Sequence, residues 1–428
     1  MVAADDAPAS ADPSRLARRL NTTDAVVIGL GSMIGAGVFA AIGPAARIAG
    51  TSLLIGLAVA AGVAYCNATS SATLAALYPE SGGAYVYGRR RLGASWGFLA
   101  GWGFVVGKLA SCAAMALTFA HYAAPELARP LAIGAVVALT GVNYLGIKKT
   151  VMVTRVIVLL VLLALATVVA AVLFGGEVEP GRLWPLDDVG PRAVLQAAGL
   201  LFFAFAGYAR LATLGEEVID PARTIPRAIP LALSITLVVY ALVAVSALLA
   251  VDAVTLGEAR APLAAAVEAG RLSWLSPAVR IGATVASLGV LLSLIVGVSR
   301  TAFAMASSGD LPAFLAAVHP RYRVPHHAEL AVGAIVVAIV AVTDIRSAIG
   351  FSSFAVLTYY AITNAAALTL TREQRRWPRA LAVTGLGGCI AVAASLPTRS
   401  VVTGVAVLLA GSLGHGVRAR WSARAAPP

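Results

Sequence analysis

Apolar stretches long enough to cross a membrane recur along nearly the whole chain. A helix needs about 20 apolar residues to span a hydrocarbon layer of ~30 Å. Inside lipid every backbone N–H and C=O must be paired within the protein, so these stretches are expected to be α-helices. We predict about twelve of them, over residues 24–46, 52–77, 96–123, 130–146, 152–174, 193–217, 228–251, 276–305, 328–344, 347–370, 378–396 and 400–417.

The composition excludes a water-soluble protein. Of the 428 residues, 59% are hydrophobic and 12% are charged. A soluble domain carries about 25% charged residues. The sequence therefore predicts an all-α membrane protein without a separate soluble domain, with the lipid bilayer as its surroundings.

The net charge of +12 reflects membrane topology rather than nucleic-acid binding. With the N-terminus placed in the cytoplasm, 21 of the 32 basic residues fall in the inside segments and nine in the outside loops. Such a bias sets the orientation of membrane helices. We expect a multi-pass protein of the cytoplasmic (inner) membrane with both termini inside and no nucleic-acid partner. The sequence identifies no protein partner.

Chemistry-bearing side chains form no recognisable catalytic or metal-binding pattern. The cysteines stand alone without metal-ligand or redox spacing, and no Ser/His/Asp arrangement is visible. The first 20 residues contain no secretory signal. We therefore expect no metal, no cofactor and no enzymatic activity.

Two of the predicted helices are weakened at mid-membrane. The first contains four glycines within residues 29–37, and the sixth contains Phe202–Tyr208 followed by a charge at Arg210. Each glycine costs about 1 kcal/mol in a helix, so a break is expected in the first. Interrupted helices at matching positions of two halves indicate a transporter's binding site. The alternative is close helix packing through small residues.

The two weakened helices divide the chain into two five-helix units. Each unit opens on a weakened helix, as in an internal repeat. We predict a disordered cytoplasmic tail, a first repeat, a second repeat, two additional helices and a short C-terminal cytoplasmic tail, over residues 1–20, 21–175, 193–370, 371–418 and 419–428.

Unwound segments of this kind suit a zwitterionic ligand. A break exposes amide N–H groups and the positive end of the following half-helix, which favour a carboxylate. It also frees carbonyl groups, which favour an ammonium. An amino acid carries both groups on one carbon and needs no charged side chain to be held.

Four stretches resemble the amino acid–polyamine–organocation (APC) transporter superfamily, in order and over essentially the whole chain. They are GSMIGAGVFAAIGPAA from Gly31, YPESGGAYVYGRRRLG from Tyr78, FFAFAGYARLATLGEEVIDPARTIPRAI from Phe202, and SRTAFAMASSGDLPAFLAAVHPRYRVP from Ser299. The resemblance implies a five-plus-five inverted repeat of LeuT type with broken helices 1 and 6, plus two C-terminal helices. It also implies alternating access around a site between those helices.

The resemblance also implies binding residues. The substrate carboxylate would meet the amides of Gly35, Ala36 and Gly37. Its ammonium would meet carbonyls at or near Met33, Phe203, Ala204 and Ala206. Phe203 matches the aromatic residue that caps the site as a gate, with ordinary core packing as the alternative.

A carboxylate pair follows the sixth helix. The resemblance assigns Glu216 and Glu217 to salt bridges that lock the inward gate. Plain solvated interfacial charge is the alternative for this pair.

Two departures from the family pattern bear on the substrate. Sodium-independent relatives often carry a lysine in helix five, where this chain has Val161. Permeases for cationic amino acids carry an acidic residue in helix three, where this chain has Gly107 and then Lys108. A site without that acid, near a lysine, disfavours arginine or lysine as substrate.

Lys108 and Arg210 are the coupling candidates, because charges within a membrane are costly and are functional candidates by default. Alternatively, Lys108 snorkels and Arg210 pairs with carbonyls freed by the break. The function predicted is a secondary transporter of small neutral L-amino acids, sodium-independent, with proton coupling or exchange. An exporter, a polyamine or amine carrier of the same fold, and a non-transporting amino-acid sensor remain alternatives.

Overall fold

The computed structural model describes residues 20–35, 37–78, 82–146, 151–175, 178–212 and 218–425. Within these ranges the regular structure is helical, joined by turns and loops, and Leu20 and Val218 form a β-bridge. The main helices are α1 Thr22–Met33, α2 Gly37–Ala49, α3 Leu53–Leu77, α4 Ala84–Leu92, α5 Ala94–Ala123, α6 Ala128–Tyr144, α7 Val151–Phe174, α8 Pro191–Phe205, α9 Ala209–Ala212, α10 Pro221–Ala250, α11 Ala253–Glu258, α12 Pro262–Glu268, α13 Ser276–Ser307, α14 His326–Val342, α15 Ile345–Leu368, α16 Arg379–Ser395 and α17 Thr398–Ala425.

The helices have the lengths and composition of membrane spans. Within the described residues, nine spans are long and apolar enough to cross a membrane, and α14 and α16 are shorter apolar helices. The prediction of an all-α membrane protein is confirmed, whereas the number twelve stays a prediction. Three short helices, α4, α11 and α12, lie in connections for which no helix was expected, and α17 continues beyond its predicted end.

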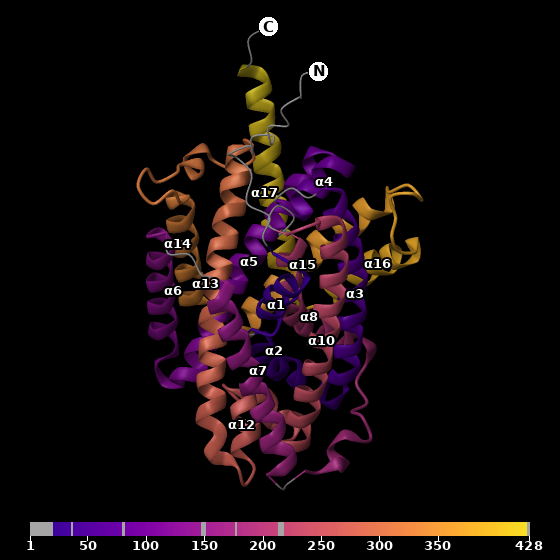
Figure 1. Ribbon diagram of the computed structural model, residues 1–428, viewed down its shortest axis with the longest axis vertical. Helices are drawn as coiled ribbons and strands as arrows, with labels where there is room; N and C mark the ends of the chain where they lie inside the picture. The colour runs from indigo at the N-terminus through magenta and orange to yellow at the C-terminus, as the bar shows by residue number, and fades with distance from the viewer. Residues whose placement is uncertain are drawn as a thin grey trace, which may run out of the picture.

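The long helices run roughly parallel to the long axis of the molecule (Figure 1). The pair α1 and α2 lies in the middle, α6 and α14 lie at one side, and α16 lies at the other (Figure 1). We call the end where α4 lies and α17 finishes the terminal end, and the end near α12 the loop end. Helix α5 packs against α13 and α15, so it runs through the interior of the bundle.

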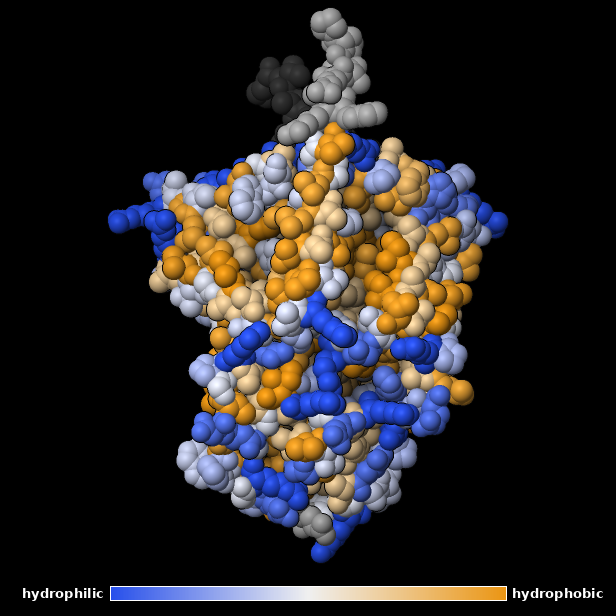
Figure 2. All heavy atoms as spheres, turned by 180° about the vertical axis from the view of Figure 1, so that it is seen from behind, coloured by the Kyte–Doolittle hydropathy of each residue, from blue (hydrophilic) through white to orange (hydrophobic). Residues whose placement is uncertain are grey.

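The outer surface suits a lipid environment. Large apolar side chains on α7 point outward, among them Met152, Leu159 and Phe174. Figure 2 shows broad apolar areas over the upper part of one face, with hydrophilic side chains at the upper rim and again below. Apolar patches of this extent on the outside of a helical bundle are the surface that a bilayer covers.

Both weakened helices are broken, as predicted. Helix α1 ends at Met33 and α2 begins at Gly37. Helix α8 ends at Phe205, and a 3₁₀ turn, η4 (Ala206–Tyr208), leads into α9. A 3₁₀ stretch inside a helix often marks a functional hinge. The division into two five-helix repeats is not tested by these elements and stays a prediction.

Candidate functional site

The two breaks pack directly against each other through glycines. A Cβ at Gly37 would lie 2.6 Å from the Cα of Ala204, and a Cβ at Gly207 would lie 2.1 Å from the carbonyl oxygen of Ser32. Both contacts are with backbone, which cannot move aside like a side chain. The sequence needs glycine here so that the backbones of the two broken helices can meet.

The backbone expected to hold a carboxylate lies at this junction. Gly35 is buried, and a Cβ added to it would lie 2.1 Å from Cγ2 of Val290 on α13. Gly37 is buried against Ala204, whereas Ala36 lies outside the described residues. The role of these amides in substrate binding stays a prediction.

Two of the carbonyls expected to bind an ammonium face one tyrosine. Tyr240 on α10 is 2% exposed. Its hydroxyl can donate to the carbonyl of Met33, and it lies 3.0 Å from the carbonyl oxygen of Ala204. Tyr240 was not predicted from the sequence, in which its hydroxyl stands among those of Ser234, Thr236 and Ser246 in the same helix.

Lys108 reaches the second break. Its Nζ donates to the carbonyl of Ala206 at 3.4 Å, and its side chain is buried between α5 and η4. Among the described residues it is the one Lys or Arg that is buried. Arg210, the other coupling candidate, lies on α9 with an exposed side chain. The structure thus brings Lys108 to the junction and leaves Arg210 at the surface.

The two phenylalanines of the sixth helix have different surroundings. Phe203, the predicted gate, is 9% exposed, whereas Phe205 is fully buried. Phe205 packs edge-on against the ring of Tyr240, with the ring centroids 5.1 Å apart. Phe205 therefore supports the junction through its contact with Tyr240. The position of Phe203 does not test its role as a gate.

Helix α7 closes one side of α1. Val161, at the position where some relatives have lysine, is 2% exposed. A Cβ at Gly31 would lie 2.9 Å from Cγ2 of Val158, so the two helices touch. Further toward the terminal end, Arg155 on α7 forms an ion pair with Asp24 in the first turn of α1.

The start of α1 is also tied to the chain that follows α9. Leu20 pairs with Val218, and the amide of Ile219 donates to the carbonyl of Leu20 at 2.8 Å. Asp24 and Asn21 form a capping box that begins α1. The proposed gate residues Glu216 and Glu217 lie outside the described residues.

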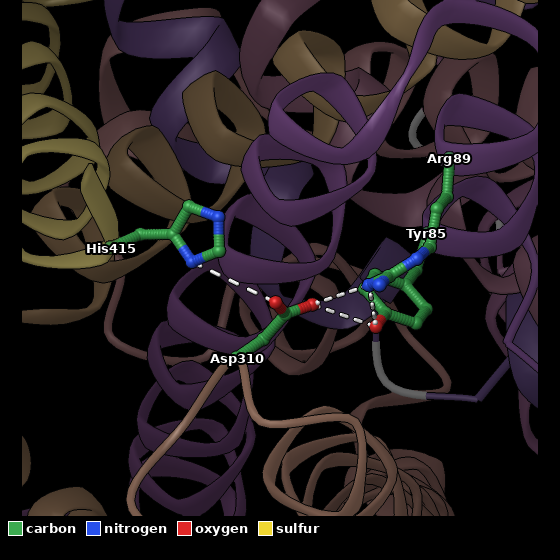
Figure 3. Close-up of polar contacts among 4 residues, drawn as sticks. All are labelled: Tyr85, Arg89, Asp310 and His415. Carbon is green, nitrogen blue, oxygen red and sulfur yellow. Dashed lines mark hydrogen bonds and ion pairs between the residues drawn. The ribbon is translucent and has the colours of Figure 1, made fainter. Parts of the chain in front are cut away.

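A polar cluster at the terminal end joins three helices (Figure 3). Asp310, just after α13, is 8% exposed. One of its oxygens accepts hydrogen bonds from Arg89 at 3.0 Å and from Tyr85 at 2.7 Å, both on α4. Its other oxygen lies 3.7 Å from Nδ1 of His415 on α17, a pair that is ionic when the histidine is protonated. We call these four residues the Asp310 cluster.

No member of the Asp310 cluster was predicted from the sequence. Asp310 lies in the fourth family-like stretch, and Tyr85 and Arg89 lie in the second. Asp310 is more than 200 residues from both in sequence, so nothing in the sequence indicated their contact. Glu329 on α14 was also missed; it is 3% exposed, and its Oε2 has no hydrogen-bond partner among the described residues. Within the ranges described, no group of His, Cys, Asp and Glu could hold a metal ion.

Two broken membrane helices that meet at a buried junction are typical of secondary transporters, whose binding sites lie at such breaks. The sequence model of the amino acid permease family matches residues 20–413, and the chain belongs to this family. The family and the relatives below make the protein a transporter.

The chain is similar to several transporters along most of its length. It is 61% identical to an uncharacterized transporter of Mycobacterium tuberculosis, over 95% of this chain and 92% of that protein. It is 26% identical to the branched-chain amino acid permease of Bacillus subtilis, over 88% of this chain and 86% of that protein. It is 28% identical to the chloroplastic cationic amino acid transporter 7 of Arabidopsis thaliana, over 82% of this chain and 65% of that protein.

Proposed function

We propose that the protein carries small neutral L-amino acids across the cytoplasmic membrane by alternating access, independently of sodium. The observation that carries this proposal is the buried Lys108 ammonium against the Ala206 carbonyl at the second break. A buried positive charge at the site repels a second cation. Arginine, lysine and polyamines are therefore poor substrates in this proposal.

The substrate's two charged groups have separate partners at the junction. The carboxylate binds the amides of Gly35, Ala36 and Gly37, where the N-terminus of α2 favours negative charge. The ammonium binds carbonyls of the two breaks, at Met33, Phe203, Ala204 and Ala206. The single hydroxyl hydrogen of Tyr240 is shared between two of these carbonyls, those of Met33 and Ala204, and Lys108 donates to the carbonyl of Ala206. A bound ammonium then competes with protein donors, so that binding changes the contacts between the helices.

Coupling and gating are assigned to side chains around this junction. Lys108 supplies either a fixed positive charge or the group that carries a proton, and the alternative to proton coupling is exchange. Phe203 caps the site, and the pair Glu216 and Glu217 forms inward-gate salt bridges. The terminal end faces the cytoplasm in this proposal. The protein is a carrier and not an enzyme.

Other functions of the same fold are distinguished by substrate and turnover. The relatives are named as a branched-chain amino acid permease and a cationic amino acid transporter. The buried lysine favours the neutral class for this chain. A sensor would bind an amino acid without moving it, and an exporter would move it outward.

The test combines binding with transport. Purified protein is screened by thermal shift against the twenty amino acids and putrescine, because a ligand of the folded state raises its stability by mass action. Hits are then measured as uptake and as counterflow in proteoliposomes with and without sodium. We expect small neutral amino acids to give the largest shifts and the fastest uptake. Arginine or putrescine as best substrate would contradict the proposal, and binding without counterflow would indicate a sensor.

A further inference from the structure

One tyrosine hydroxyl contacts the backbone of both broken helices. Met33 is the last residue of α1, and Ala204 lies in the last turn of α8. The Tyr240 hydroxyl bonds to the carbonyls of both residues. Its own helix, α10, is continuous from Pro221 to Ala250. A continuous helix thus holds the two discontinuous ones at the point where each is broken.

Both carbonyls need a donor from outside their helix. The last four carbonyls of a helix lack the amide that would follow one turn later. A buried acceptor without a partner costs about 1–3 kcal/mol, and lipid offers no water to replace it. Tyr240 is 2% exposed, so its hydroxyl meets this need in a closed environment.

The neighbouring hydroxyl on α10 does not bond to the Met33 or Ala204 carbonyl. Thr236, one turn earlier on α10, donates to the carbonyl of Ala232 at 2.8 Å. The ring of Tyr240 is fixed by the edge-on contact with Phe205. The hydroxyl is therefore the side-chain donor that the structure presents to both carbonyls.

A hydroxyl carries one hydrogen and can fully satisfy one carbonyl at a time. Two carbonyls that share it leave one acceptor available to a second donor, such as a substrate ammonium. We propose that Tyr240 is a positioning residue of the transport site, which aligns the Met33 and Ala204 carbonyls and leaves one of them for the substrate ammonium. This proposal rests on the transport function proposed above and names a residue for its ammonium subsite.

The test variant is Tyr240→Phe, which removes the hydroxyl and keeps the ring that packs on Phe205. Its matched control is Tyr122→Phe. Tyr122 is also buried, and its hydroxyl donates to the carbonyl of Phe39 at 3.2 Å and accepts from the amide of Leu263. The control thus removes a buried hydroxyl on α5 that bonds to backbone in the first turn of α2 and to Leu263 on α12, but to neither the Met33 nor the Ala204 carbonyl.

Uptake in proteoliposomes separates positioning from general stability. We expect Tyr240→Phe to raise KM about tenfold, the size of one buried hydrogen bond, with a smaller change in kcat. Tyr122→Phe should keep KM within about twofold, whatever its effect on thermal stability. A KM within twofold for Tyr240→Phe, or an equal rise in the control, would overturn the proposal.

A second variant covers the case in which Tyr240→Phe does not accumulate as folded protein. Tyr240→4-aminophenylalanine keeps the ring and an N–H donor at the same place. We expect its KM to stay within about twofold of the wild type, because donation to the carbonyls is retained and each carbonyl oxygen has a second lone pair for the substrate ammonium. A tenfold rise in this variant would contradict the donor role.

The proposal can be separated from the transport function itself. If the wild type takes up none of the twenty amino acids, the proposed function fails. Hydrogen exchange then tests Tyr240 without a substrate. Peptides that cover the two breaks should exchange faster in Tyr240→Phe than in Tyr122→Phe, and unchanged exchange at both breaks would overturn the proposal.

Discussion

At the scale of single residues, Lys108 decides the electrostatics of the site. Its ammonium is buried and donates to the Ala206 carbonyl of the second break. A lysine at this place can replace a bound metal cation, which accounts for sodium independence in the proposed mechanism. In the proposed function, its charge also disfavours arginine as a substrate.

Lys108→Gln keeps a side-chain N–H, on a side chain one bond shorter, and removes the charge. We expect wild-type uptake to be independent of sodium and the variant to lose either its pH dependence or net uptake, while remaining folded. Arg210→Gln is the control, because Arg210 is exposed on α9. Uptake is measured across pH in proteoliposomes. A sodium requirement in the wild type, or an unchanged pH profile in Lys108→Gln, would refute the assignment.

Phe203 and Phe205 allow a gate to be distinguished from core packing. Phe203→Ala should reduce uptake at least tenfold, because it removes the ring proposed to cap the site. The loss of stability should be small, because Phe203 lies at the edge of the core. Phe205→Ala should lower stability by about 3–5 kcal/mol, because Phe205 is fully buried and supports Tyr240. Uptake and thermal unfolding are measured on both variants. Equal, mild effects on uptake would identify Phe203 as a packing residue.

At the scale of elements, the junction depends on the close approach of two broken helices. Gly207→Ala places a Cβ 2.1 Å from the Ser32 carbonyl oxygen, so the breaks must separate. We expect loss of uptake in this variant. Gly62→Ala on α3 is the control, since its Cβ meets nothing within 4 Å and alanine favours a helix by about 1 kcal/mol. Normal uptake by Gly207→Ala would show that the breaks need not touch.

The Asp310 cluster ties α4 and α17 to the end of α13 (Figure 3). Asp310→Asn keeps the shape of the side chain and removes the charge that Arg89 pairs with. We expect a loss of about 1–3 kcal/mol in unfolding free energy, because Asp310 is buried whereas Arg89 is partly exposed. Hydrogen exchange should rise in α4 and α17 together. A rise in only one of them would mean that the cluster does not join the two helices.

At the scale of the whole molecule, orientation follows from the distribution of basic residues. Reporter fusions after Arg418 and in the connection between α11 and α12 test it. We expect a fluorescent protein to fold at the first site and alkaline phosphatase to be active at the second, because basic residues are retained in the cytoplasm. The reverse pattern would invert the proposed topology.

The sequence by itself determined the class of fold and the position of both breaks. Apolar stretches of membrane length force helices, because lipid leaves backbone groups no other partner. Clustered glycines mark the first break, since glycine weakens a helix locally. These are local properties, and they can be read without knowing which helices are neighbours. The family-like stretches added the expectation that helices one and six meet.

The tertiary structure alone decided which side chains serve the breaks. Tyr240 lies 207 residues from Met33 and 36 from Ala204, and nothing in its own helix indicates that its hydroxyl bonds to both. The same holds for Asp310, which meets His415 and Arg89 from distant parts of the chain. Lys108 and Arg210 look alike in sequence, as single charges in apolar surroundings, yet one is buried at the junction and the other is exposed. The physical reason is that hydrogen bonds and burial depend on how helices distant in sequence pack together. Hydropathy and glycine content act on the local segment that contains them.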